Sequence, residues 1–104
     1  MIHIKYDKNN PIAFNDGNII AIANKIVKEH GSTDEFHYIE VGQDLFITAI
    51  RSAMCQTNVD HRNLVVDIVL DENNIQRITL TDKYRLSDYT NIPDLISDLL
   101  MPLL

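Results

Sequence analysis

The sequence predicts a single α+β domain over residues 1–104, with two or three helices packed on one face of a mostly antiparallel sheet of about four strands. Three observations lead to this fold class. Short segments alternate apolar and polar residues with the period of a strand, longer segments repeat apolar residues with the period of a helix, and turn residues separate them. The expected order of elements is β-α-β-α-β-β-α.

The first third of the chain predicts a strand and an amphipathic helix. Residues 2–6 alternate and are rich in β-branched side chains, and residues 7–11 form a turn that ends at a proline. We expect Asn15 to cap the helix that follows and Gly31 to end it in the left-handed conformation. One apolar stripe marks the buried face of this helix: Ile19, Ile20, Ile22, Ala23, Ile26 and Val27.

Residues 36–41 predict a second strand, whereas residues 43–56 fit two structures. Helical spacing places the apolar residues of the second segment on one face and Thr48, Arg51 and Ser52 on the other. A hairpin at the start of this segment is the alternative. Because that hairpin pairs apolar with polar residues, a helix is favoured.

Residues 64–82 predict a β-hairpin, and its register follows from its apolar faces. The register that brings the apolar residues together makes two cross-strand pairs: Ile68 with Ile78, and Val66 with Leu80. It leaves a three-residue loop at residues 72–74. Asp67 and Arg77 then lie diagonally on the opposite face, where they form a cross-strand ion pair.

The C-terminal segment is unusually apolar. A last helix is expected to begin near Pro93. Five large apolar residues end the chain: Leu99, Leu100, Met101, Leu103 and Leu104. Because a chain end that nothing holds in place is usually polar, we expect this segment to dock on its own sheet or on another chain. A homodimer is one such assembly.

The charge of the chain is negative and unevenly distributed. The formal net charge is −6, to which residues 1–31 contribute +1 and residues 32–104 contribute −7. Basic residues do not cluster, so direct binding of nucleic acid is not expected. No apolar run reaches the roughly 20 residues of a membrane span and no signal peptide is predicted, so a cytoplasmic protein without membrane contact is expected.

Residues that carry catalytic or metal chemistry are few and scattered. Three widely separated glycines exclude a glycine-rich phosphate loop, and a single cysteine, Cys55, excludes an internal disulfide. Neither a zinc-ligand spacing nor a serine nucleophile motif occurs, so no metal, cofactor or catalytic residue is predicted. For a small enzyme or ligand-binding module, the candidate residues are His37, Asp60, His61 and Asp67.

A short, acidic chain without a catalytic motif favours a non-catalytic protein that acts by occupying a macromolecular partner. Inhibitors, immunity proteins and accessory proteins of mobile elements act in this way. We expect a protein partner, anchored by the apolar C-terminal residues and steered by acidic residues. The expected acidic contacts are Asp67, Asp71, Glu72, Asp88, Asp94 and Asp98. Two alternatives stay open: the small enzyme or ligand-binding module, and a structural subunit that self-assembles through the C-terminal apolar helix.

Overall fold

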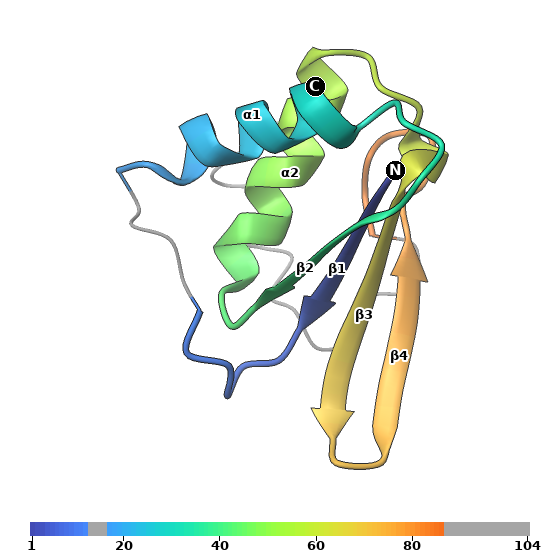
Figure 1. The fold of residues 1–104 in the computed structure, drawn as a ribbon. Helices are drawn as coiled ribbons and strands as arrows, with labels where there is room; N and C mark the ends of the chain where they lie inside the picture. Colours follow the sequence, from blue (N-terminus) through green and yellow to red (C-terminus); the bar gives the residue numbers. More distant parts are fainter. Residues whose placement is uncertain (13–16, 87–104) are drawn as a thin grey trace.

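The structure, a computed structural model, describes residues 1–12 and 17–86 (Figure 1). Its elements follow the predicted order up to the hairpin, with one short 3-10 helix added: β1 (Ile2–Tyr6), α1 (Ile19–His30), β2 (His37–Val41), α2 (Asp44–Gln56), η1 (His61–Asn63), β3 (Leu64–Asp71) and β4 (Asn74–Thr79). The helix expected within residues 43–56 is therefore confirmed. The expected Asn15 cap and the expected C-terminal helix lie outside the described residues.

The four strands form one mixed sheet in the order β2-β1-β3-β4. β1 pairs in parallel with both β2 and β3, and among the described strands only β3 and β4 are antiparallel. The α+β class and the four strands are confirmed, but the prediction of a mostly antiparallel sheet is wrong. The physical reason lies in the connections. A helix between two strands returns the chain to the edge where the first strand began, so the second strand runs parallel to it.

The β3–β4 hairpin has a register two residues away from the predicted one. Its central pairs are Val66 with Ile78, Asp67 with Arg77, and Ile68 with Gln76. The predicted register, with its three-residue loop and its diagonal Asp67–Arg77 pair, is therefore wrong. A shift of two residues keeps every side chain on its predicted face, so the apolar pattern does not distinguish the registers. The turn does: the Asp71 carboxylate accepts hydrogen bonds at 2.8 Å from the Asn73 backbone and the Asn74 side chain.

Both helices pack on the same face of the sheet. Their buried side chains form one cluster with alternate residues of the strands: Ile2, Ile4, Val41, Leu64, Val66, Ile68 and Ile78. Because side chains alternate along a strand, the residues between these point to the other face, away from the helices. That other face is called the open sheet face below, and it carries two rows of side chains: Tyr38, His3, Val65 and Thr79, then Glu40, Lys5, Asp67 and Arg77.

Helix α1 is amphipathic, as predicted, and buries Ile19, Ala23 and Val27. Ile20, which the predicted stripe included, is 63% exposed. The helix does not end in a left-handed residue, because Gly31 has φ −61° and ψ −31°, which is helical geometry. The Gly31 N–H donates to the Val27 carbonyl oxygen at 2.8 Å, so the helical hydrogen bonding continues through it. The predicted left-handed stop is therefore wrong.

Helix α2 is buried on every side. All its residues from Phe46 to Met54 are buried, including Thr48, Arg51 and Ser52, which the helical pattern placed on a polar face. The helix contacts α1 and shares the buried cluster with the sheet, and the chain after β4 also reaches it. A single apolar stripe identifies the side of a helix that faces one neighbour. It does not reveal that the polar side of the helix is also covered, as it is in α2.

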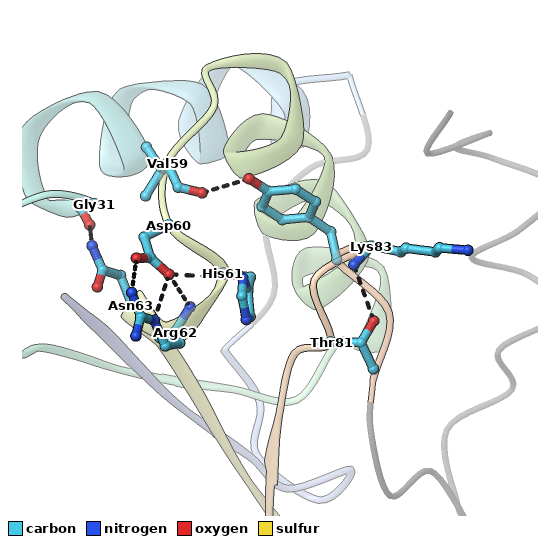
Figure 2. Close-up of polar contacts among 9 residues, drawn as sticks. Gly31, Val59, Asp60, His61, Arg62, Asn63, Thr81 and Lys83 are labelled. Carbon is cyan, nitrogen blue, oxygen red and sulfur yellow. Dashed lines mark hydrogen bonds and ion pairs between the residues drawn. The ribbon is translucent and has the colours of Figure 1, made fainter.

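Tyr84 holds the chain after β4 against the rest of the domain. Its hydroxyl donates to the Val59 carbonyl oxygen at 2.7 Å (Figure 2). Its own carbonyl oxygen accepts a hydrogen bond from Arg51 Nε at 2.9 Å. With a φ of 62°, Tyr84 adopts the left-handed conformation, at the bend of a loop that Leu80 and Leu86 close by an antiparallel bridge. This residue thereby joins α2, the loop after α2 and the end of the described chain.

Candidate functional site

Two histidines stack at the edge of the sheet where the parallel strands begin. The rings of His30, which ends α1, and His37, which begins β2, lie 3.8 Å apart between centroids and within 3° of parallel. Beside them, the Met1 ammonium donates to the carbonyl oxygens of His30 at 2.7 Å, Thr33 at 2.6 Å and Glu35 at 3.2 Å. A pocket of about 310 Å³ opens at this histidine pair.

The surroundings of His37 disfavour its protonated form. Burial lowers the pKa of His37 below its ordinary 6.5, and positive charge on His30 and on the Met1 ammonium lowers it further, whereas Glu29 acts in the opposite direction. The Glu29 carboxylate lies 3.8 Å from Nε2 of His30. His37 therefore binds a proton less readily than a histidine in water does.

Acid is expected to destabilise the protein through the histidine pair. Because the pKa of His37 is lower in the folded chain than in the unfolded chain, its contribution to stability is present above pH 6.5 and is lost as the pH falls below that value. The urea midpoint of unfolding should therefore be lower at about pH 5 than at about pH 7. His37→Phe keeps a stacked ring without a proton site, so it should reduce this difference, whereas the control His61→Phe should not. An equal loss in wild type and His37→Phe would contradict the expectation.

A second polar cluster lies in the loop between α2 and β3 (Figure 2). Asp60 accepts hydrogen bonds from the Arg62 backbone at 2.9 Å and from the Arg62 guanidinium at 2.7 and 3.1 Å. These bonds hold the pKa of Asp60 well below its usual range. His61 Nδ1 lies 3.7 Å from the same carboxylate. An ionised carboxylate engaged by its neighbour in this way caps η1 and is a weak proton acceptor.

On the open sheet face, Asp67 bonds to a basic side chain from each neighbouring strand. The His3 Nε2 and Asp67 Oδ2 atoms lie 2.7 Å apart, and Arg77 Nε and Nη2 donate to the two carboxylate oxygens at 2.9 and 3.1 Å. The Arg77 bonds lower the pKa of Asp67 most, and His3 lowers it further. Farther across the same row, Lys5 Nζ lies 3.7 Å from the Glu40 carboxylate. The row is therefore a line of charges that are already paired within the sheet.

Aromatic side chains surround His3 on the same face. The His3 ring meets Tyr38 edge to face at 5.1 Å and Phe36 at 6.1 Å between centroids. Phe36 and Tyr38 are 52% and 50% exposed. Exposed aromatic rings beside polar groups are typical of surfaces that contact other proteins.

The β3–β4 hairpin projects past the end of β1 (Figure 1). β1 pairs with β3 only as far as Ile68, and β3 continues to Asp71. The projecting part, called the hairpin end below, carries the apolar residues Leu70 and Ile75, which are 41% and 58% exposed. Asp71 and the exposed Glu72 lie between them at the turn. Ile75 pairs with Val69 and therefore lies on the same face of the hairpin as Asp67 and Arg77, whereas Leu70 lies on the opposite face. The hairpin end thus presents one apolar side chain on each face beside its acids.

A pocket of about 300 Å³ lies where the hairpin end meets the loop after β1. Its lining comes from residues 7–9 of that loop and residues 69–72 of the hairpin. Hydrogen bonds from the Asn73 backbone and the Asn74 side chain lower the pKa of Asp71. Asp71 therefore stays ionised at neutral pH, and the hairpin end keeps its negative charge.

The residues expected for an enzyme or ligand-binding site do not converge. His37 belongs to the histidine pair, Asp60 and His61 belong to the loop cluster, and Asp67 belongs to the open sheet face. The strand registers place His37 and Asp67 on opposite faces of the sheet. Among the described residues, no hydrogen bond or ion pair joins the three groups. General acid–base chemistry needs such groups within hydrogen-bond reach of one substrate atom, which this arrangement does not provide.

Three of the predicted acidic contacts are described by the structure. Asp71 and Glu72 lie at the hairpin end, and Asp67 lies on the open sheet face with its carboxylate engaged by His3 and Arg77. The remaining predicted contacts lie outside the described residues: Asp88, Asp94, Asp98, Leu99, Leu100, Met101, Leu103 and Leu104.

Sequence reasoning missed the stack of His30 on His37 and two further contacts that join distant parts of the chain. His3 is a partner of Asp67, and Tyr84 is a partner of Arg51. Placing residues 2–6 beside the first strand of the hairpin was the step needed to find the first contact, because their polar positions then share a face. No signal in the polar segment around Tyr84 pointed to the second.

Comparisons with protein-family models, with curated proteins and with solved structures find no match for this chain. In the part of the chain that the structure describes, no helix is both long and apolar enough to span a membrane. No group of three or more His, Cys, Asp or Glu side chains within residues 1–12 and 17–86 is placed to hold a metal ion.

Proposed function

We propose that the protein is a non-catalytic binding protein that acts by occupying a protein partner, and that the hairpin end makes the contact. The observation that carries the proposal is the projection of the hairpin past β1, with Leu70 and Ile75 exposed beside Asp71 and Glu72. Apolar anchors with charged groups at their rim are the usual composition of a protein–protein contact. A projecting hairpin presents such anchors without strain on the rest of the sheet.

The charge of the hairpin end indicates the kind of partner. Asp71 is held ionised by its hydrogen bonds, and the Glu72 side chain is exposed next to it. The whole chain carries a formal charge of −6, so its field repels acidic surfaces and attracts basic ones. A basic protein surface with a cleft that receives the hairpin end, and with apolar walls against Leu70 on one face and Ile75 on the other, is the complementary partner.

The C-terminal contacts predicted from the sequence extend the same proposal. Asp88, Asp94 and Asp98 add negative charge, and residues 99–104 supply a second apolar anchor. A chain shortened to end at Asp98 tests how much residues 99–104 contribute to binding of the partner. If it contributes, the shortened chain dissociates faster from the partner while its association rate changes little, because apolar anchors act mainly on dissociation.

Kinetic measurements with a partner captured from cell lysate test the role of the hairpin end. Glu72→Lys should slow association about tenfold at low salt, because it reverses one steering charge. Ile75→Ser should accelerate dissociation, because it removes an apolar anchor. Glu35→Lys, the same charge reversal at an exposed acidic residue outside the hairpin, is the matched control and should change neither rate.

Capture of a protein from the lysate does not by itself support the proposal. The proposal is supported only if the binding rates of that protein change when residues of the hairpin end are substituted. Circular dichroism of each variant establishes that the fold is retained. A partner that binds Glu72→Lys and Ile75→Ser with the rates of the wild type contacts another surface, and this result contradicts the proposal. The absence of any stoichiometric partner for the folded protein contradicts it as well.

A further inference from the structure

The charges on the open sheet face alternate in sign from one edge of the sheet to the other. Across β2, β1, β3 and β4, the row consists of Glu40, Lys5, Asp67 and Arg77. From β2 to β4 its signs are negative, positive, negative and positive. From β4 to β2 the signs are positive, negative, positive and negative. If a second copy of the row is turned end to end and laid against the first, every charge therefore meets an opposite charge.

We propose that the open sheet face binds a second copy of this chain around a two-fold axis that runs parallel to the strands. Such an axis reverses the order of the strands across the sheet and keeps each row level with itself. Glu40 then faces Arg77 of the partner subunit, and Lys5 faces Asp67 of the partner subunit. The reciprocal contacts follow by symmetry, so all four charges of the row meet an opposite charge. Two sheets packed face to face with nearly aligned strands form a common arrangement.

The neighbouring row supplies apolar contact area under the same symmetry. It consists of Tyr38, His3, Val65 and Thr79. The axis places Tyr38 against Thr79 of the partner subunit and His3 against Val65 of the partner subunit. Tyr38 is 50% exposed in the single chain, so packing against the second copy removes a large ring from water.

The charge row also selects this axis over its alternative. A two-fold axis that is parallel to the sheet, perpendicular to the strands and level with the charge row keeps the strand order, so Glu40 faces Glu40 of the partner subunit. Like charges placed opposite one another oppose association. This surface is separate from the acids of the hairpin end, so the inference does not depend on the proposed function.

Charge reversal with reciprocal rescue tests the dimer. Sedimentation equilibrium of the wild type should show a monomer of 11.9 kDa in exchange with a species of twice that mass. Glu40→Lys and Arg77→Glu should each weaken self-association by about tenfold or more, because each places like charges in contact. An equimolar mixture of the two variants should restore association, since Lys at position 40 then faces Glu at position 77 in one contact and the native Glu40 faces the native Arg77 in the other.

Two neutral variants separate the interface from effects on folding. Tyr38→Ser should weaken dimerisation without any change of charge. Ile20→Ser removes an equally exposed apolar side chain from the outer side of α1 and should leave dimerisation unchanged. A wild type that stays monomeric at every concentration overturns the proposal. So does a mixture of Glu40→Lys and Arg77→Glu that associates no better than either variant alone.

Discussion

Replacing Arg51 with alanine is expected to lower the free energy of unfolding by about 3 kcal/mol. The Arg51 side chain is fully buried in α2, and its Nε donates to the Tyr84 carbonyl oxygen at 2.9 Å. Alanine removes the packing of the long side chain and leaves a cavity between α2 and its neighbours. It also leaves the partly buried Tyr84 carbonyl without this donor, so both consequences destabilise the folded state.

Two other variants separate these causes in urea denaturation followed by circular dichroism. Arg51→Met restores most of the volume but not the donor, so its loss of stability should be smaller than that of Arg51→Ala. Arg62→Ala is the matched control, because the Arg62 side chain is 79% exposed and its guanidinium bonds to Asp60 in the same loop. An Arg51→Ala midpoint as high as the Arg62→Ala midpoint would contradict the structural role of Arg51.

Gly42→Ala is expected to lower the free energy of unfolding by about 2 kcal/mol, because a methyl group has no space there. A Cβ at Gly42 would lie 1.9 Å from the backbone oxygen of Asn10 and 3.1 Å from that of Asp7. The Gly42 N–H donates to the Ile12 carbonyl oxygen at 2.8 Å, which holds the loop after β1 against the end of β2. Since backbone atoms cannot rotate out of the way as a side chain can, the loop itself must move and this hydrogen bond must lengthen.

The matched control for this substitution is Gly17→Ala. Gly17 is exposed and lies outside the buried cluster, so a methyl group added there does not enter the core. Its midpoint should equal or slightly exceed that of the wild type, because alanine reduces the conformational entropy of the unfolded chain. For Gly42→Ala, proteases should also cleave residues 7–12 faster. Equal midpoints and equal cleavage rates for the two variants would show that the loop tolerates the methyl group.

Local periodicity was enough to predict the secondary structure, but not the direction of the strands. The periods of β1, α1, β2, α2 and the hairpin are properties of short segments, and each of these elements is present in the structure. Strand direction depends on the connections. With a helix in each of the first two connections, β1, β2 and β3 run parallel. One antiparallel hairpin does not determine the direction of the strands outside it, which is why the prediction of a mostly antiparallel sheet is wrong.

The same distinction applies to the open sheet face. The sequence predicts that Asp67 and Arg77 pair, because both lie in one hairpin and the pairing of two strands in a hairpin depends on nearby residues. The contact between Asp67 and His3 joins residues 64 positions apart, so it requires the order of the strands. Arg51 is a third case. Its burial depends on the chain after β4 folding back onto α2, and no pattern within the helix itself reports that.

The place of β1 in the sheet has a consequence for how the chain folds. β1 is an inner strand of the sheet, and it is synthesised before both of its neighbours, β2 and β3. Ile2 and Ile4 therefore have no sheet partner on one side until β3 has left the ribosome. Pairing over such a separation in sequence slows folding relative to helical proteins of the same length. Until β3 has emerged, the nascent chain thus exposes one side of an apolar strand that chaperones can bind and that other chains can pair with.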